Sequence, residues 1–307
     1  MKKSNYGEYK CPFCDHKGEL AYQMGRYSVY QCIYCGTGGV SPLPTKSEIA
    51  EFYDGFMFCA NSQNYPGVLT GSKLLFSQLK LKHGCGLKML DVGGGGGFYS
   101  KAFEDLGYGK STYVDLDPQA CDFARGQLGV ENIINDDVLN LDGAQKFDFI
   151  MCRHLIEHLL NPSVFVEKII NCLAPGGTLL LVFPNGQSLE YLAYPGLGLV
   201  KRMQVIKEAQ KTSLSYILLK FLSGKILHGI DPPRHLWAIS KKGIDHFLKS
   251  RDIDYEISTY PLTDPAYSPY FKPVKPYEKI QCFFGNMITS RIFGGTHLAV
   301  TIRNKKK

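Results

Sequence analysis

The stretches KMLDVGGGGG at residues 88–97 and VDLD at residues 114–117 decide the fold of this 307-residue chain. In each, an apolar run of strand type ends at an acid, and a helix-like segment at 98–106 lies between the two. Glycines remove Cβ atoms where a ligand must lie against the backbone. An acid at the tip of the second strand can accept hydrogen bonds from ribose hydroxyls. The pattern indicates a β–loop–α–β unit of nucleotide-binding type.

The glycine spacing separates the classes of nucleotide ligand. The dinucleotide pattern G-x-G-x-x-G fails, because Phe98 and Tyr99 stand where the third glycine is needed. A phosphate-binding P-loop is absent, because Glu104 replaces the leading glycine before 109–111. The loop instead alternates from an acid through glycines: Asp91, Gly93, Gly95 and Gly97. It therefore suits a ligand with a ribose and a base but no phosphate; a flexible glycine linker is disfavoured by the regular flanking strands.

These stretches resemble motifs of the class I S-adenosylmethionine-dependent methyltransferases, and the resemblance runs from about residue 46 to the end. The resembling segments, in chain order, are 88–97, 114–117, 135–138 (NDDV), 147–152 (FDFIMC) and 173–183 (LAPGGTLLLVF). Each segment alone is a weak signal, and the resemblance rests on finding all five in the order and spacing of the family. It implies an α/β fold: a Rossmann-like seven-stranded methyltransferase sheet with helices on both faces and an antiparallel seventh strand.

The resemblance implies S-adenosylmethionine as the cofactor. Asp115 matches the ribose-binding acid of the family, and an acid at Asp137, or at Asp136, would meet the adenine amino group. Tyr53 would close over the cofactor, with a core role as the alternative. Arg153 would bind an anionic acceptor or cap local carbonyls. The cofactor-binding residues implied are Asp91, Gly93, Gly95, Gly97, Asp115, Leu116, Asp137, Val138, Arg153 and Tyr53.

Four of the ten cysteines form two C-x2-C pairs near the start of the chain: Cys11, Cys14, Cys32 and Cys35. This spacing is typical of a zinc ribbon, in which two tight knuckles close a tetrahedral four-thiolate site. Because four sulfur ligands leave no open position, the zinc is expected to be structural. A disulfide framework is the alternative, and nothing in the sequence suggests export.

The motifs divide the chain into a zinc ribbon at 1–44, a helical segment covering the cofactor at 45–85, and a methyltransferase domain at 86–307 with an insertion at 187–232. Helices are expected at 45–53, with Thr45 as cap, and at 73–83. The insertion is apolar and basic, and it is interpreted as a lid or a homodimer face rather than a membrane-surface helix.

The charge and hydropathy of the chain limit the kinds of partner and the location that we expect. The net charge is +7, and residues 201–251 hold eleven Lys and Arg against Glu208, Asp231 and Asp245. A solvated helical face explains this excess, and an anionic partner is the alternative. The chain starts without the apolar stretch of a secretion signal and has no apolar run of about eighteen residues, so a cytoplasmic protein without a membrane span is expected.

Catalytic groups are expected beyond the carboxyl end of the fourth strand, in CRHLIEH at 152–158. His154 is the predicted general base, because methylation of an aliphatic hydroxyl requires removal of its proton. His158 and His235 are further candidates, and a structural role is the alternative for each. The string H-x-x-E-H also occurs in zinc proteases, but here it lies in a methyltransferase context. A second metal held by His154, Glu157 and His158 stays open.

Three functions remain at this stage. The first is O-methylation of a small-molecule acceptor, anionic or neutral: a sugar, a sugar nucleotide or a surface-polysaccharide unit. Carbon methylation is its variant, and it would need a base beside a carbonyl. The second is an RNA methyltransferase that grips RNA with the ribbon and the basic segment, although the ribbon carries few net cations. The third is a methyltransferase-like scaffold without catalysis. Oligomeric state and acceptor atom stay open.

Overall fold

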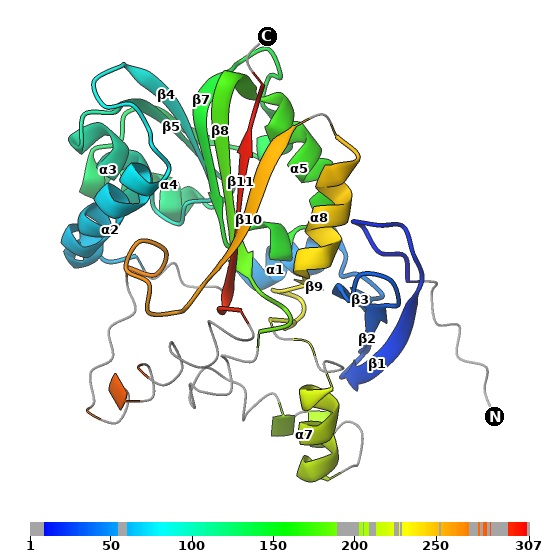
Figure 1. The fold of residues 1–307 in the computed structure, drawn as a ribbon. Coiled ribbons are helices and arrows are strands. Elements are labelled where there is room, and N and C mark those ends of the chain that lie inside the picture. The colour runs from blue at the N-terminus through cyan, green and yellow to red at the C-terminus, as the bar shows by residue number, and fades with distance from the viewer. Residues whose placement is uncertain are drawn as a thin grey trace.

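The structure is a computed structural model that describes residues 9–54, 60–188, 203–204, 206–208, 213–223, 227, 229–251, 253–269, 276, 279–280, 283 and 294–305. Within these residues the chain forms two sheets, one of seven strands and one of four (Figure 1). The larger sheet carries the glycine loop, and the smaller one carries the cysteine pairs.

The seven-stranded sheet has the order β10-β11-β8-β7-β4-β5-β6. Its strands are β10 (Asp254–Tyr260), β11 (His297–Arg303), β8 (Leu173–Pro184), β7 (Phe147–Arg153), β4 (Leu87–Val92), β5 (Gly109–Asp115) and β6 (Ile133–Asn135). The strands from β8 to β6 run parallel, and β11 is antiparallel to both of its neighbours. The predicted fold class is confirmed. The strand order reverses between β4 and β7, the point where ligands bind in open α/β sheets.

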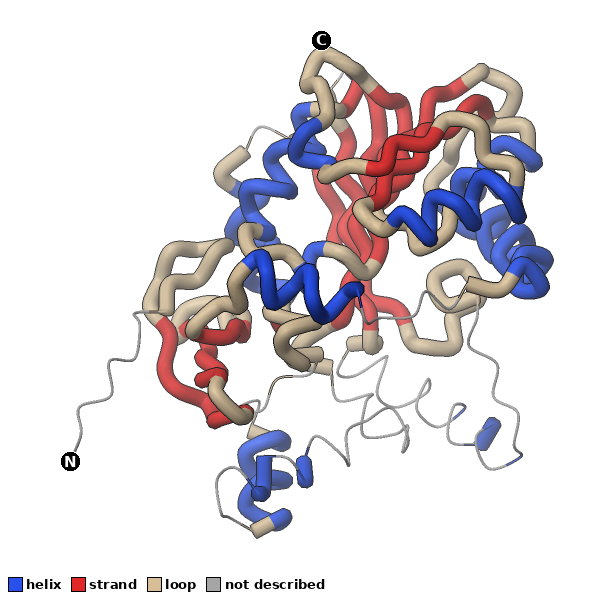
Figure 2. The backbone as a smooth tube through the Cα atoms, turned by 180° about the vertical axis from the view of Figure 1, so that it is seen from behind, coloured by secondary structure: helices blue, strands red, loops and turns tan. Residues whose placement is uncertain are grey.

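Helices cover both faces of this sheet (Figures 1 and 2): α2 (Tyr65–Gln78), α3 (Phe98–Asp105) and α4 (Pro118–Leu128) on one, α5 (Pro162–Asn171) and α8 (Lys241–Lys249) on the other. Successive strand residues alternate between the two cores. Met89 and Phe149 pack with α2, α3 and α4, whereas Leu90 and Ile150 pack with α5 and α8. Because both faces are buried, these strands are apolar throughout, as the sequence shows.

The small sheet is built mainly from the cysteine-bearing segment: β1 (Gly18–Met24), β2 (Tyr27–Cys32) and β3 (Gly38–Ser41). Its fourth strand is β9 (Trp237–Ala238), which pairs antiparallel with β3. The ribbon therefore incorporates a strand from the segment that follows the predicted insertion. This pairing was not predicted, because a strand of two residues has no periodicity to read.

Two helices were predicted before the first strand of the large sheet, and the structure agrees with one of them and differs from the other in its bounds. Thr45 caps α1 (Lys46–Asp54) as predicted: its Oγ1 accepts from the Glu48 amide at 3.2 Å, and Glu48 Oε2 accepts from the Thr45 amide at 2.7 Å. The helix predicted at 73–83 has the wrong bounds. It starts at Tyr65, with a proline in its first turn, and ends at Gln78, because Lys80 takes a left-handed φ of 57°.

The predicted insertion at 187–232 lies largely outside the described residues, and α7 (Leu214–Leu222) is a described helix within it. The predicted division at residues 44 and 85 stays a prediction. None of the described helices is long and apolar enough to cross a membrane.

Candidate functional site

The glycine loop joins β4 to α3 in a conformation that L-residues rarely adopt. Gly93, Gly95 and Gly97 have φ values of 62°, 56° and 73°. A Cβ on Gly97 would lie 2.9 Å from the Ala124 side chain of α4, and one on Gly93 would lie 3.0 Å from the Leu155 side chain that follows β7. Gly97 therefore lies close to a side chain of α4, and Gly93 lies close to a side chain that follows β7. With these positive φ values, only glycine fits the loop without strain.

Asp91, at the end of β4, holds the loop through hydrogen bonds to α3. Its side chain is buried, and its Oδ2 accepts hydrogen bonds from the Ser100 amide at 3.2 Å and from the Ser100 hydroxyl at 3.0 Å. Burial raises the pKa of Asp91 to about 7, against the lowering effect of the Ser100 hydrogen bonds. The carboxylate thus ties the end of β4 to the first turn of α3, and so fixes the loop between them.

Asp115 lies at the end of β5, beside the loop. Tyr113 donates its hydroxyl hydrogen to Asp115 Oδ2 at 2.6 Å and accepts from the Gly96 amide at 2.9 Å, so one phenol joins the acid to the loop. The Asp117 amide donates to Asp115 Oδ1 at 3.0 Å. Leu116, next to Asp115, is 67% exposed. Sequence reasoning missed Tyr113, although alternation along β5 turns it to the same side as Asp115.

The acids after β6 act as local caps. Asp137 Oδ1 accepts from the Leu139 amide at 2.9 Å, at the start of the short 3-10 helix η2 (Val138–Asn140). Asp136 Oδ1 accepts from the Asp137 amide at 2.7 Å and from the Asn140 side chain at 2.9 Å. Asp137 has one carboxylate oxygen outside its cap, and Val138 beside it is buried. The structure thus places these residues at the same sheet edge as Asp115.

The three predicted catalytic histidines converge on one carboxylate. Glu157, in the short 3-10 helix η3 (Ile156–His158), lies with Oε1 at 3.4 Å from His154 Nδ1 and 3.8 Å from His158 Nε2. The rings of His158 and His235 have centroids 4.5 Å apart. His154, Glu157, His158 and His235 are called the histidine cluster below. Their convergence was not predictable, because His235 comes from a distant segment of the sequence.

Glu157 is the unusual member of the histidine cluster. Its side chain is 2% exposed, and within the described residues neither carboxylate oxygen has a hydrogen-bond partner. Burial raises its pKa to about 7, although the charges of His158 and Arg234 lower it. A carboxyl that changes charge near neutral pH is suited to acid–base chemistry. Sequence reasoning considered Glu157 only as a metal ligand.

His154 follows β7 with a left-handed φ of 51°, and its amide donates to the Val182 carbonyl at 2.7 Å. Burial of the ring and the charge of Arg153 lower its pKa. The side chain of His154 is 40% accessible to solvent, and its ring centroid lies 5.0 Å from that of the buried His297. His154 is therefore a neutral imidazole at pH 7 with one side open.

Tyr53 of α1 lies beside the histidine cluster. Its hydroxyl is 2.7 Å from His158 Nδ1. Burial chiefly, with the charges of Glu157 and Asp115, raises the pKa of Tyr53 to about 12, opposed by Arg234. The hydroxyl is therefore protonated at neutral pH, and it fixes the orientation of the His158 ring.

Arg153 points into the protein rather than toward the cluster. Its guanidinium carbon lies 4.6 Å from the centre of the Tyr99 ring of α3, and it donates to the Tyr267 carbonyl. Arg153 therefore joins β7 to α3 and to the loop after β10. The predicted cofactor or acceptor contact of Arg153 stays a prediction.

A model of the family described as "Methyltransferase domain" matches residues 54–252. This chain belongs to the class I S-adenosylmethionine-dependent methyltransferases. The predicted family and the predicted enzyme class are confirmed, and the matched region contains the glycine loop and all four residues of the histidine cluster.

Relatives of this methyltransferase include O-methyltransferases. A ubiquinone biosynthesis O-methyltransferase from Coxiella burnetii (strain Dugway 5J108-111) is 32% identical over 125 residues, which is 39% of this chain and 52% of the relative. The mitochondrial ubiquinone biosynthesis O-methyltransferase from Rattus norvegicus is 28% identical over 163 residues, 49% of this chain and 44% of the relative. The methyltransferase thus spans about half the length of these curated relatives.

Solved structures with a similar arrangement include the plantazolicin methyltransferase BpumL in complex with SAH, which covers 86% of this chain and 91% of its own at 16% identity, with a TM-score of 0.46. A SAM-dependent methyltransferase from Archaeoglobus fulgidus covers 82% of this chain and 99% of its own, also at 16% identity, with a TM-score of 0.48.

The two C-x2-C pairs of the methyltransferase come together as predicted. All four cysteines are buried and free of disulfides, and their sulfurs lie within 4.8 Å of one another. The distances are 3.6 Å for Cys11–Cys35, 3.4 Å for Cys14–Cys32 and 3.5 Å for Cys14–Cys35. Such distances are far longer than a disulfide bond and fit a set of thiolates around one zinc ion. The donors therefore fit a structural zinc site.

A second group of the methyltransferase could hold a divalent metal. The ligand atoms of Glu157, His158 and His235 lie within 4.8 Å of one another. Two imidazoles and one carboxylate suit a first-row transition metal better than magnesium. This set differs from the one considered in the sequence, since His235 takes the place of His154.

Proposed function

We propose that this protein transfers a methyl group from S-adenosylmethionine to an oxygen of a small-molecule acceptor. The observation that carries the proposal is the adjacency of two sites at the switch point of the sheet. The glycine loop follows β4, the histidine cluster follows β7, and these strands are hydrogen-bonded neighbours, with Val92 opposite Cys152. A methyl donor in the loop would thus lie beside a set of proton-accepting side chains.

The cofactor, when bound, supplies a methyl group attached to a cationic sulfur. After transfer of the methyl group, the rest of the cofactor is a neutral thioether and is the leaving group. The protein must align the acceptor and take up one proton. In our proposal, His154 Nε2 accepts the proton of the acceptor hydroxyl as its oxygen bonds to the methyl carbon. Glu157, 3.4 Å from the other ring nitrogen of His154, orients the ring and stabilises the imidazolium that forms. His158 and His235 lie beside the same carboxylate and would contact the acceptor.

The names of the relatives support oxygen as the methyl acceptor, since both are O-methyltransferases that serve ubiquinone biosynthesis. We therefore propose a hydroxylated small molecule as the acceptor. The narrower sequence prediction of a sugar, a sugar nucleotide or a polysaccharide unit has no support from these names and stays a prediction.

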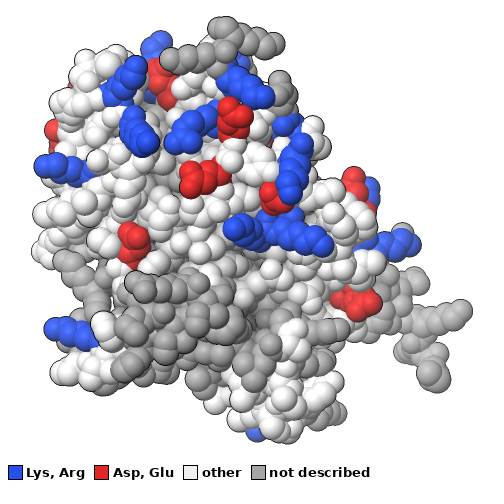
Figure 3. Space-filling model, viewed as in Figure 1, with Lys and Arg blue, Asp and Glu red and all other residues white. Residues whose placement is uncertain are grey.

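Among the described residues, the face of the molecule seen in Figure 3 offers no continuous basic surface for RNA. On the face seen in Figure 3, Lys and Arg are interspersed with Asp and Glu instead of forming one continuous basic surface. RNA binding depends on neutralising consecutive phosphates, so interspersed acids weaken it. An RNA acceptor would predict retention on bulk RNA that is lost steeply with salt, and we expect no such retention.

The test is calorimetry with S-adenosylhomocysteine. We expect the wild-type chain to bind it, and Asp115→Ala to weaken binding by about tenfold or more, because a charge-assisted hydrogen bond contributes about 1.5–3 kcal/mol. The matched control is Asp122→Ala, an acid on α4 that pairs at 2.8 Å with Arg125 on the surface. Absence of binding to the wild-type chain, or equal weakening by both substitutions, contradicts the proposed cofactor site.

A further inference from the structure

The second cysteine knuckle is hydrogen-bonded to the start of α8. Ser240, the N-cap of that helix, donates from its hydroxyl to the Cys35 carbonyl at 2.7 Å. Its amide donates to Thr37 Oγ1 at 3.2 Å, and the two hydroxyl oxygens lie 3.0 Å apart. Both Thr37 and Ser240 are fully buried. A ligand residue of the metal site and a helix cap thus share one buried hydrogen-bond network, in which each polar group is costly to leave unpaired.

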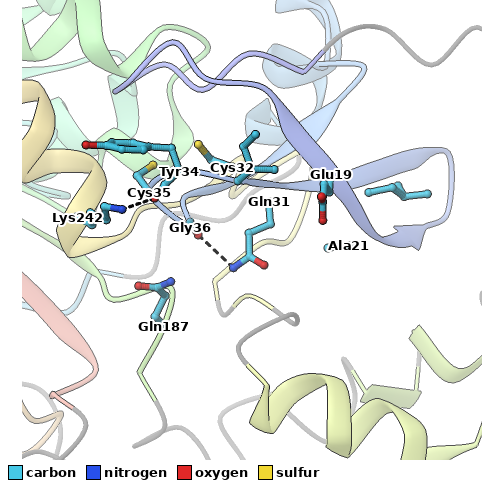
Figure 4. Close-up of a pocket in the computed structure, with 11 residues that line it drawn as sticks. Glu19, Ala21, Gln31, Cys32, Tyr34, Cys35, Gly36, Gln187 and Lys242 are labelled. Atoms are coloured by element: carbon cyan, nitrogen blue, oxygen red, sulfur yellow. Dashed lines mark hydrogen bonds between the residues drawn. The ribbon is translucent and has the colours of Figure 1, made fainter.

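Close backbone contact reinforces this junction. A Cβ on Gly243 of α8 would lie 2.3 Å from Thr37 Oγ1 and 3.3 Å from the Cys35 sulfur. A Cβ on Gly39 would lie 2.4 Å from the Trp237 ring. On the outer side, Lys242 of α8 donates to the Tyr34 carbonyl at 2.5 Å and lies over the Tyr34 ring (Figure 4). The ribbon therefore packs on this segment without room for adjustment.

The same segment is held from its other side by the histidine cluster. The Leu236 amide donates to the Glu157 carbonyl at 2.8 Å, and the Trp237 indole donates to the Leu159 carbonyl at 2.7 Å. Towards the ribbon, the Val40 amide donates to the Leu236 carbonyl at 3.2 Å, and Trp237 and Ala238 pair with β3. His235 immediately precedes this clamped strand, so its position depends on both sides.

We propose that the zinc ribbon is a positioning element of the acceptor site: through Thr37, Ser240 and β9 it holds His235 against Glu157 and His158. Zinc at the four cysteines fixes the second knuckle, and the knuckle fixes the segment at 235–240, which begins with His235. This assignment of an acceptor side rests on the proposed function. Thr37 and Ser240 are positioning residues, because they act through His235 and touch no reacting atom.

The cofactor side is expected to be independent of the ribbon. Its loop and acids lie at the ends of β4, β5 and β6, whereas the ribbon lies beside α8 at the other flank of the sheet (Figure 1). Loss of zinc should therefore loosen the segment at 235–240 and leave S-adenosylhomocysteine binding unchanged. This separation distinguishes positioning from a general loss of stability, which would weaken both sides.

The chain provides its own reporter, because Trp237 is its only tryptophan. Its ring is 5% exposed and lies at the junction of ribbon and cluster. Zinc is removed from the full chain with a thiol-reactive mercurial and a chelator, then restored. We expect tryptophan emission to move to longer wavelength, and the Leu236 and Trp237 amides to exchange hydrogen about tenfold faster or more. Both changes should reverse with zinc, with an unchanged dissociation constant for S-adenosylhomocysteine throughout.

Substitutions separate the hydrogen-bond network from the metal itself. Thr37→Val in the zinc-loaded chain should reproduce the shift in Trp237 emission and the faster exchange, with zinc content unchanged, whereas Thr37→Ser, which keeps the hydroxyl, should restore both. Unchanged emission and exchange after zinc removal overturn the proposal, and so does a parallel loss of S-adenosylhomocysteine binding. If the zinc-loaded wild-type chain itself binds no S-adenosylhomocysteine, the proposed function fails instead, and Trp237 still decides whether the ribbon holds this segment.

Discussion

The buried carboxyl of Glu157 gives the sharpest prediction, because its charge opposes folding. Its pKa rises from 4.5 to about 7 in the folded chain, so the folded state keeps a proton that the unfolded state releases between these pH values. The free energy of unfolding therefore falls as pH rises through this window. Each pKa unit corresponds to about 1.4 kcal/mol, so the full penalty at pH 8 is about 3 kcal/mol.

Glu157→Gln removes this titration while keeping the shape of the side chain. We expect the variant to be more stable than wild type by up to about 3 kcal/mol at pH 8, and nearly equal to it at pH 4.5. The measurement is urea unfolding of both chains at the two pH values, in the presence of a chelator too weak to strip the cysteine site. Glu131→Gln is the matched control, because this acid lies on the surface, 3.3 Å from Lys110, and should change stability by less than about 1 kcal/mol.

The sign of the effect decides the outcome. If Glu157→Gln is instead less stable at pH 8 than wild type, the carboxylate is compensated in the native state and the reasoning is refuted. A divalent metal held by Glu157, His158 and His235 would produce that reversal, and added metal would then stabilise only the wild-type chain. Once an acceptor is known, turnover of the wild type should rise with pH through about 7, and Glu157→Gln should flatten this rise.

Three further predictions concern the loop and the cluster. His154→Ala should lower kcat by about 10²–10⁴ with an unchanged dissociation constant for S-adenosylhomocysteine, whereas His83→Ala, on the exposed turn after α2, should change neither; full turnover in His154→Ala excludes it as the base. Gly97→Ala should cost about 1–2 kcal/mol in urea unfolding, since φ is 73° there, and an unchanged midpoint would contradict the loop geometry. Tyr53→Phe should remove the 2.7 Å contact to His158 and raise KM more than it lowers kcat; a pure loss of kcat would contradict a positioning role.

Local signals in the sequence predicted the parts of the structure that depend on neighbouring residues. The glycine loop after β4 and the cysteine pairs could be predicted from residue spacing. Closely spaced glycines indicate a backbone that can lie against a ligand, and two C-x2-C pairs indicate four sulfurs around one metal ion. The alternation of Met89 and Leu90 between two cores also follows from the strand itself. For these elements, burial of apolar side chains and turn chemistry leave little choice, so the sequence was a sufficient guide.

Contacts between distant segments could not be predicted in the same way. The pairing of β9 with β3 places Gly39 opposite Trp237, a residue from a distant part of the sequence. The pairing involves only two residues of each strand. The start of α2 at Tyr65 was missed because apolar periodicity is weak where the helix packs on the loop at 265–269, which leaves Gly71 no room for a side chain. In both cases tertiary packing, rather than local preference, determines the structure.

The histidine cluster was predictable in part from local sequence signals and depends in part on contacts between distant segments. Glu157 and His158 follow β7 at a spacing visible in the sequence, but Tyr53 and His235 reach them from α1 and from the segment that precedes β9. A buried carboxylate without hydrogen bonds is costly in a folded chain, and such cost is retained where the group serves a function. The energetic defect of Glu157 and the convergence of three elements on it therefore support the same conclusion. In our proposal, this carboxyl is the centre of the acceptor site, and the ribbon helps to hold the residues around it in place.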